Sequence, residues 1–217
     1  MKNQSTEDYL RGILKLAGEG GSVSTSALAR HLGIGDGSVT DMVKKLSDKM
    51  LITYVPYQGV SLTDKGKSIA VKMMRRHRLW EIFLTRHLGY TWDEVHEEAE
   101  HLEHATSDEL ERRLSAMLGH PEIDPHGEPV PGPDGRFVSP DDRPLNEFMA
   151  GDTVIITRVS DVSSAILQHA SQVGLSLGKK VAIKEKREFD GSLVVVVSRK
   201  ETFLSREVAD SIFAVRV

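Results

Sequence analysis

Two glutamates and a histidine stand close together in the acidic stretch HEEAEHLEH, residues 96–104. Spacings of three and four residues place Glu100, Glu103 and His104 on one face of a helix, where their side chains converge. Carboxylate oxygens with one imidazole and no thiol suit a hard or borderline divalent cation such as Mn²⁺ or Fe²⁺. The spacing therefore predicts a metal site, and the alternative is a solvated acidic helix face.

The residues around these three carry many negative charges. No Lys or Arg occurs between Arg86 and Arg112, although the same stretch is rich in Asp and Glu. Carboxylates at this density repel each other and destabilise a helix unless a countercharge is present. A bound cation would supply that countercharge.

A second set of possible ligands lies on the preceding predicted helix. His77 and Glu81 are four residues apart, and His96 lies one turn before Glu100. A His–Glu pair alone is usually a surface ion pair, but His96 allows two helices to present two adjacent cation sites. Asp8 is by default a carboxylate favoured at a helix N-terminus. We expect the other histidines to be surface or satisfied groups: His31, His87, His101, His120, His126 and His169.

The composition is that of a globular protein with room for two or three domains. Of its 217 residues, 39% are hydrophobic and none is cysteine, which excludes disulfides, zinc–thiolate sites and thiol catalysis. No apolar run is long enough to span a bilayer and the N-terminus is not signal-like, so we expect a cytoplasmic protein with no membrane contact. No nucleophile elbow, P-loop or dinucleotide fingerprint appears, and nothing supports an enzyme.

The charge is unevenly distributed along the chain. Residues 1–78 hold 13 Lys and Arg against 7 Asp and Glu, a net charge of +6. The remainder holds 15 against 25, a net charge of −10, and the whole chain carries −4. A basic N-terminal third predicts a polyanionic partner for that third alone.

The N-terminal third has the pattern of a winged helix. After a helix over about residues 5–18, the segment from Thr25 predicts a helix-turn-helix with Gly33 at the turn, and LITYV and VSLT form a hairpin around PYQG. The helix from about Asp36 to Lys49 would enter the DNA major groove. On this helix, the residues expected to contact base edges are Ser38, Thr40, Asp41 and Lys44. Lys45 is expected to contact phosphate. A winged helix used only for protein contacts is the alternative.

The rest of the chain predicts helices and then strands. Helices are expected over about 64–88, 92–105 and 108–118, and seven of the eight prolines follow between residues 121 and 144, as a linker or an irregular wrap. Short strands are expected within 152–159, 179–198 and 211–217, with a helix over 163–172. The fold class is multidomain, mainly α with a small β domain. The expected divisions are 1–72, 73–120, 121–144 and 145–217.

Together these segments resemble the diphtheria-toxin-repressor family of metal-dependent regulators, especially its three-domain manganese-responsive branch. The resemblance runs from TEDYLR through the winged helix, RRHRLWEIFL, HEEAEHLEHATSDELERRL and DPHGEPVP to the C-terminal strands. It implies a winged helix-turn-helix DNA-binding domain, a helical metal-binding and dimerisation domain, and an SH3-like, FeoA-like β-barrel.

The resemblance also implies two metal sites. The primary site would use Asp8, Glu100, Glu103 and His104. The second would use His77, Glu81, His96 and a group from the C-terminal barrel, for which Asp161 is the best candidate and Ser163 and Gln168 are competitors.

Two departures from relatives bear on these sites. Iron-responsive members have methionine and cysteine where this chain has Asp8 and Glu100, so the harder oxygen donors favour manganese. The short two-domain manganese regulators carry a glutamate where this chain has Arg11.

The function implied is a Mn(II)-activated repressor that binds a palindromic DNA operator as a homodimer and controls manganese-uptake genes. Its dimer contact would use Leu79, Trp80, Phe83 and Leu84 with the helix 110–118. Alternatives are an iron-responsive, Fe(II)-activated regulator of the same family, a winged-helix regulator that senses a small organic ligand, and a cation-buffering or transport-accessory protein.

Overall fold

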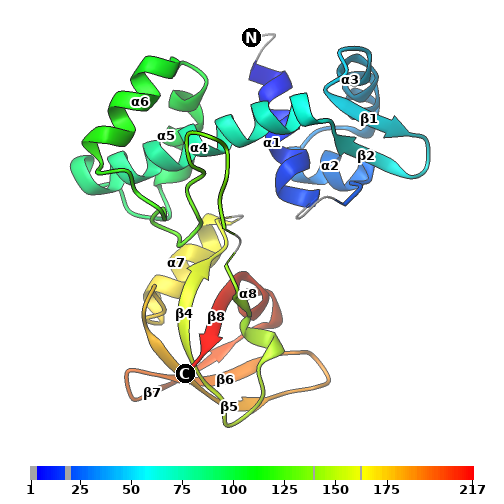
Figure 1. Cartoon of the computed structure of the whole chain (residues 1–217). Helices are drawn as coiled ribbons and strands as arrows, with labels where there is room; N and C mark the ends of the chain where they lie inside the picture. Colours follow the sequence, from blue (N-terminus) through cyan, green and yellow to red (C-terminus); the bar gives the residue numbers. More distant parts are fainter. Residues whose placement is uncertain (1–3, 18–20, 139, 162) are drawn as a thin grey trace. The chain divides into compact units, whose positions relative to one another are not determined.

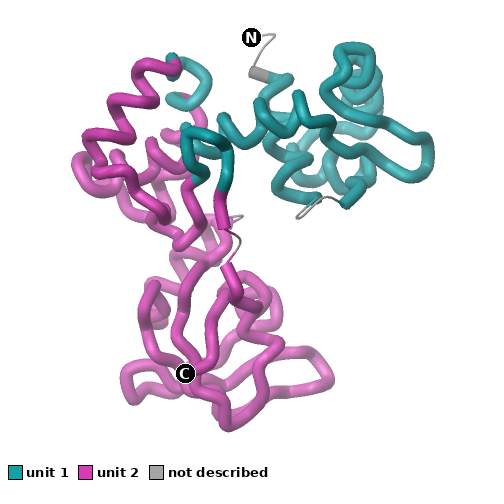
Figure 2. Tube along the Cα trace, in the orientation of Figure 1, with its two compact units in different colours: residues 1–77, 102–107, 131–136 teal, residues 78–101, 108–130, 137–217 magenta. Residues whose placement is uncertain are grey.

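The computed structural model describes residues 4–17, 21–138, 140–161 and 163–217 (Figure 1). The chain forms two compact units (Figure 2). Unit 1 comprises residues 1–77, 102–107 and 131–136, and unit 2 comprises residues 78–101, 108–130 and 137–217. Within the described ranges, no helix is both long and apolar enough to cross a membrane.

Unit 1 contains the winged helix that the sequence predicts. Its elements are α1 (Gln4–Ala17), α2 (Thr25–Leu32), α3 (Asp36–Asp48), β1 (Ile52–Val55), β2 (Gly59–Leu62) and the first half of α4 (Asp64–Leu88). Helix α1 was expected to reach residue 18, which lies outside the described residues. Ser24 caps α2 by accepting a hydrogen bond from the Ala27 amide, and Gly33 ends it at φ +65°. The turn before α3 therefore needs glycine.

The apolar faces of these elements form one core. Leu10 and Ile13 of α1, Leu28 of α2 and Val43 of α3 are fully buried in it. Gly12 lies where α1 approaches α2, because a Cβ there would come 3.1 Å from the His31 ring. Helix α1 is thus packed closely on the helix-turn-helix.

Unit 2 begins with the second half of α4, followed by α5 (Val95–Glu103, whose last two residues belong to unit 1) and α6 (Asp108–Met117). Leu79 and Ile82 pack with Leu114 and Leu118 in a small core. Leu79 is fully buried and Leu84 is 2% exposed within the single chain, so neither side chain is available for a dimer contact. Our expectation for these two residues was wrong, because the inner face of an amphipathic helix was taken for its outer face.

The C-terminal part of unit 2 is a six-stranded antiparallel sheet with strand order β3-β8-β4-β5-β6-β7. Its elements are β3 (Arg143–Pro144), a 3-10 turn (Leu145–Glu147), β4 (Thr153–Val159), α7 (Ser164–Gln172), β5 (Lys180–Lys186), β6 (Leu193–Val197), β7 (Lys200–Leu204), α8 (Arg206–Ser211) and β8 (Ile212–Arg216). Strand β7 and helix α8 were not predicted.

The proline-rich segment is held by specific contacts within each unit. In unit 1, the Arg75 guanidinium donates to the Pro131 carbonyl. In unit 2, Arg158 of β4 pairs with Glu128 at 2.9 Å and with Asp142 at 2.7 Å. These contacts describe an irregular wrap along the packed elements.

Candidate metal centre and DNA-binding surface

Three of the four residues predicted for the primary site come together in unit 1. Asp8 of α1 lies beside Glu103 at the end of α5 and His104 just after it, with one ligand atom from each residue within 4.8 Å of the others. The Asp8 Oδ1 is 2.9 Å from the His104 Nε2, and the Glu103 Oε1 is 3.6 Å from the same nitrogen. Two oxygens and one nitrogen therefore converge from two elements that are far apart in sequence.

Glu103 is the most buried member of this group. Its side chain is fully buried, and among the described residues its Oε1 has no hydrogen-bond partner. Burying a carboxylate oxygen without a hydrogen-bond donor reduces the free energy of unfolding. The oxygen is directed toward His104, where a cation would satisfy it, so the donor set fits a hard divalent ion.

Glu7 orients the histidine of this group, a role that the sequence did not indicate. Its Oε2 lies 2.8 Å from the His104 Nδ1, which leaves the Nε2 facing Asp8 and Glu103. Metal-binding histidines commonly donate their other ring N–H to a carboxylate in this way. The signal for Glu7 in the sequence was its position directly before Asp8, an expected ligand of this site.

Glu100 makes a different contact from the one expected. Its Oε1 lies 3.7 Å from the His96 Nε2, one turn earlier on α5, and its side chain is 45% exposed. In the described part of the chain it does not belong to the group formed by Asp8, Glu103 and His104. An imidazole four residues away attracts a carboxylate on a helix surface. Glu100 as a primary-site ligand stays a prediction.

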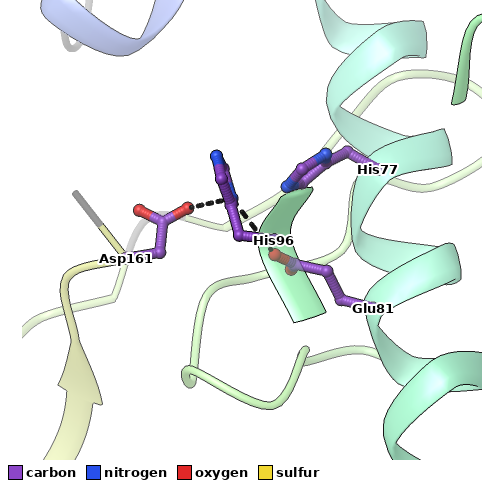
Figure 3. A group of neighbouring side chains, drawn as sticks. All are labelled: His77, Glu81, His96 and Asp161. Atoms are coloured by element: carbon purple, nitrogen blue, oxygen red, sulfur yellow. Dashed lines mark ion pairs between the residues drawn. The ribbon is translucent and has the colours of Figure 1, made fainter. Parts of the chain in front are cut away.

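Three residues of the second predicted group, Glu81, His96 and Asp161, lie together in unit 2. The His96 Nδ1 lies 3.5 Å from the Glu81 Oε1 and 3.6 Å from the Asp161 Oδ2 (Figure 3). His77 lies one turn before Glu81 on α4 and therefore shares its helix face. Asp161 follows the end of β4, while its competitor Gln168 is exposed on α7.

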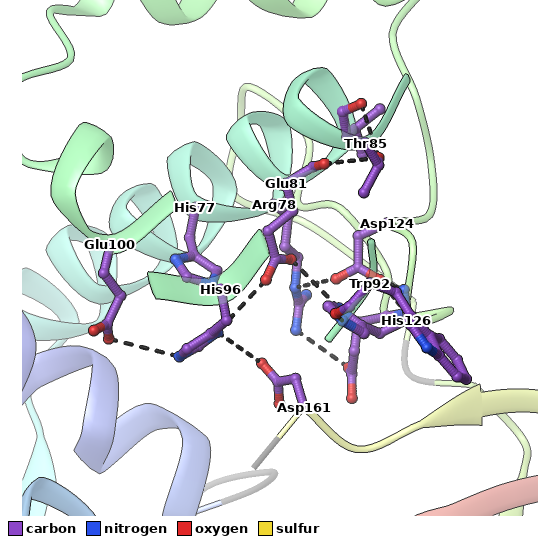
Figure 4. Close-up of polar contacts among 12 residues, drawn as sticks. His77, Arg78, Glu81, Thr85, Trp92, His96, Glu100, Asp124, His126 and Asp161 are labelled. Atoms are coloured by element: carbon purple, nitrogen blue, oxygen red, sulfur yellow. Dashed lines mark hydrogen bonds and ion pairs between the residues drawn. The ribbon is translucent and has the colours of Figure 1, made fainter. Parts of the chain in front are cut away.

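A third group, which the sequence did not indicate, shares Glu81 with the second. Asp124 and His126 of the proline-rich segment lie with Glu81 in a fully buried cluster (Figure 4). The His126 Nε2 is 2.6 Å from the Trp92 carbonyl, so it donates there and turns the Nδ1 toward Glu81, 3.6 Å away. His126 was expected to be a surface or satisfied histidine; it is fully buried, and its Nε2 is satisfied by the Trp92 carbonyl. Its burial beside Glu81 was not indicated, because an irregular segment has no periodicity that reports burial.

The charges of this third group perturb its protonation. Burial and the neighbouring Glu81 charge raise the pKa of Asp124 to about 7. Burial lowers the pKa of His126, but the Glu81 and Asp124 carboxylates outweigh it and raise that pKa to about 9. The cluster therefore binds protons in the pH range where a divalent cation would compete for the same atoms.

The Asp124–Glu128 segment is fitted closely to strand β4. The Val159 amide donates to the His126 carbonyl at 2.9 Å. Gly127 has φ +88°, and a Cβ there would lie 2.1 Å from the Thr157 carbonyl oxygen. Only glycine allows this approach. The position of His126 is thus set by the β domain.

The residues predicted to contact DNA lie on α3. Ser38, Asp41, Lys44 and Lys45 are exposed, while Thr40 is half-buried and donates its hydroxyl to the Asp36 carbonyl. On α1, the Tyr9 hydroxyl lies 3.5 Å from the Ser38 carbonyl. Tyr9 directly follows Asp8, so one helix carries both a candidate metal ligand and a contact to the candidate recognition helix.

Three protein families match successive parts of this chain. Residues 1–60 match the family described as iron-dependent repressor, N-terminal DNA-binding domain. Residues 63–132 match its metal-binding and dimerisation domain, and residues 143–216 match the FeoA domain, which is the SH3-like β domain.

Individual relatives agree. The iron-dependent repressor IdeR of Mycobacterium bovis is 33% identical over 180 residues, covering 72% of this chain and 78% of that protein. The diphtheria toxin repressor of Corynebacterium glutamicum is 32% identical over 190 residues, covering 82% and 83%. A solved structure described as a manganese-dependent transcriptional repressor in complex with manganese is 38% identical, has a TM-score of 0.92 and covers 98% of this chain and 100% of its own. The chain therefore belongs to the diphtheria-toxin-repressor family of metal-dependent, DNA-binding transcriptional repressors, which are not enzymes.

Proposed function

We propose that this protein is a Mn(II)-activated repressor that binds a palindromic operator as a homodimer and controls genes for manganese uptake. The observation that carries the proposal is the group of Asp8, Glu103 and His104 on unit 1. Asp8 and Glu103 offer only oxygen donors, and His104 offers one nitrogen. Such donors suit Mn²⁺ better than sulfur ligands would.

The remaining candidate ligands complete the proposal. Glu100 would join the primary site by rotating its exposed side chain away from His96. His77, Glu81, His96 and Asp161 would form the second site, since the last three already lie together and His77 shares the helix face of Glu81. We expect Ser163 and Gln168 to have no part in it.

The response to metal rests on α1. When bound, a divalent ion supplies two positive charges that offset the repulsion among Asp8, Glu100 and Glu103. Asp8 is then held toward Glu103 and His104, and α1 holds α3 through Tyr9 and its apolar core. In a two-fold dimer, a fixed position of α3 sets the spacing of two recognition helices, which must match DNA half-sites about 34–36 Å apart. Metal binding and DNA binding are then reciprocally coupled.

Iron is the second candidate activator, because IdeR of Mycobacterium bovis is described as an iron-dependent repressor and the relative from Corynebacterium glutamicum as a diphtheria toxin repressor. The manganese-bound structure at 38% identity and the oxygen donors at Asp8 and Glu100 favour manganese.

The test is a titration of DNA binding. An operator would be selected from random duplexes with Mn²⁺ present, and its binding measured anaerobically against free Mn²⁺, Fe²⁺ and Zn²⁺, with a chelator control. We expect Mn²⁺ to activate binding and the chelator to reduce it to a weak residual level. Binding that is indifferent to the chelator would contradict a metal-activated repressor, and activation by Fe²⁺ but not by Mn²⁺ would contradict the choice of metal.

A further inference from the structure

Arg11 places a positive charge directly on the buried carboxylate of the primary site. Its Nη1 lies 3.0 Å from the Glu103 Oε2 and 2.9 Å from the His77 Nδ1. The Arg11 side chain is 16% exposed, so solvent screens this charge only partly. All three residues belong to unit 1.

The two oxygens of Glu103 therefore have different partners. Oε2 is close to Arg11 and also to the His77 Nδ1, at 2.6 Å. Oε1 has no hydrogen-bond partner among the described residues and faces His104. Arg11 thus fixes the carboxylate in the orientation that leaves one oxygen directed at the candidate metal position.

The Nδ1 of His77 completes this group. It lies 2.6 Å from the Glu103 Oε2, which only accepts, and 2.9 Å from the Arg11 Nη1, which only donates. With its proton on Nε2, His77 accepts from Arg11 at Nδ1, and with its proton on Nδ1 it donates to Glu103. In either tautomer one of the two residues holds the His77 ring at Nδ1.

The charge of Arg11 also opposes a cation. Glu7, Asp8 and Glu103 bring three negative charges to this corner of unit 1, and Arg11 reduces the sum to −2. A divalent ion would neutralise that remainder. It would also lie only a few ångströms beyond the carboxylate that Arg11 holds, where two positive charges repel strongly in a poorly solvated site.

We propose that Arg11 is a built-in competitor of the metal, which weakens the primary site and so sets the metal level at which the repressor responds. This inference rests on the proposed metal-activated function. Arg11 has a second, opposite effect on the metal-free protein: it ties α1 to Glu103 before any ion binds. Removing it should therefore increase metal affinity and decrease DNA binding in the absence of metal.

The experiment measures Mn²⁺ affinity of the full-length protein by competition with a fluorescent metal indicator, independently of DNA. We expect Arg11→Gln to bind Mn²⁺ on the order of tenfold more tightly than wild type, since it removes a repelling charge. In the presence of chelator, its DNA affinity should fall by roughly threefold or more, because a charged hydrogen bond that holds α1 is lost.

Two further variants separate charge from geometry. Arg11→Lys keeps the charge, so its Mn²⁺ affinity should stay within about twofold of wild type. Lys15→Gln removes the same charge from an exposed position one turn later on α1 and should leave the affinity at the wild-type value. Arg11→Met repeats the charge removal with a different side chain, in case Arg11→Gln folds poorly.

The outcomes are distinct. If Arg11→Gln or Arg11→Met binds Mn²⁺ no more tightly than the wild type, Arg11 does not weaken the primary site and the proposal is overturned. If Glu103→Gln nevertheless lowers the number of Mn²⁺ ions bound per chain by one, the proposed primary site stands and only this inference fails. If wild type and Glu103→Gln bind Mn²⁺ equally, the primary site itself is wrong and Arg11 has no role in it.

Discussion

Among individual residues, Glu103 is central to the candidate metal centre, because it is fully buried and its two oxygens face different neighbours. Replacing it with glutamine keeps the size but removes the negative charge and one acceptor. We expect Glu103→Gln to lose metal-activated DNA binding. At a Mn²⁺ concentration that saturates the wild type, the DNA affinity of the variant should be about 100-fold lower than that of the wild type, which is near the upper end of the usual coupling between two binding sites.

The measurement is fluorescence anisotropy of a labelled operator with Mn²⁺ or chelator. Glu97→Gln provides the control, since Glu97 is an exposed acidic residue of the same helix α5. A Glu103→Gln protein that still responds to Mn²⁺ would remove Glu103 from the primary site.

Asp8 and Glu100 should determine the choice of metal. Asp8→Met with Glu100→Cys replaces hard oxygen donors by sulfur, so this double variant should respond less to Mn²⁺ and more to Fe²⁺ or later metals. Two negative charges are lost as well, and overall affinity can fall. The informative quantity is therefore the ratio of DNA-binding responses to Mn²⁺ and Fe²⁺, measured anaerobically at equal free metal. An unchanged ratio would assign selectivity to the second site or to geometry.

Helical spacing was sufficient to find some residues of the site but not others. It placed Glu81 and His77 on one face, and Glu103 beside His104, because ligands on one helix have a fixed period. It gave no indication of Arg11 against Glu103 or of His126 against Glu81. Those contacts join segments far apart in the chain, and they depend on tertiary packing that no local pattern encodes.

Among the elements, α3 is the one whose surface should bind DNA. Lys44 and Lys45 are both exposed on it. Replacing both with alanine should weaken operator binding and reduce the slope of log affinity against log salt by about 1 to 2, since up to two fewer counterions are released. The salt dependence would be measured by anisotropy with Mn²⁺ saturating.

Lys179 and Lys180 offer a matched control, because they are adjacent, exposed lysines of the β domain. Their double alanine variant should keep the wild-type salt slope. The opposite pattern, with the control altered and the α3 variant unchanged, would move the DNA-binding surface to the β domain.

Most elements were predictable and the failures have a common cause. The winged helix, α4, α6 and the hydrophobic strands have strong periodicity or apolar runs. Strand β7, KETFL, has only two buried side chains, and α8 has six residues, too few for a helical period to be seen. Both are stabilised by packing, with Leu204 and Ala209 in the β-domain core.

For the molecule as a whole, the buried pair Asp124 and His126 predicts an unusual dependence of stability on pH. Folding raises the pKa of Asp124 from 3.8 to about 7 and that of His126 from 6.5 to about 9. A raised pKa means that the folded state binds the proton more tightly, so the stabilisation is complete below the unfolded value and is lost as pH rises through the folded value. The metal-free protein should lose stability between about pH 4 and pH 9.

Urea unfolding with chelator present at each pH would measure this loss. The double variant Asp124→Asn, His126→Gln keeps the acceptor oxygen for the His126 and Glu128 amides and should show a flatter profile. Saturating divalent metal should reverse the trend if the cluster binds it, since protons then compete with the ion. Identical slopes for wild type and the variant would show that neither group titrates as described.

The close fit of Gly127 against strand β4 has a consequence for how this protein can vary. Irregular segments ordinarily tolerate insertions and deletions. Here the Val159 amide donates a hydrogen bond to the His126 carbonyl, and there is no room for a side chain at Gly127. One added or deleted residue between Asp124 and Glu128 would shift His126 out of place and break the Arg158–Glu128 pair. The five-residue stretch should therefore keep its length as strictly as a strand does, although it has no regular structure.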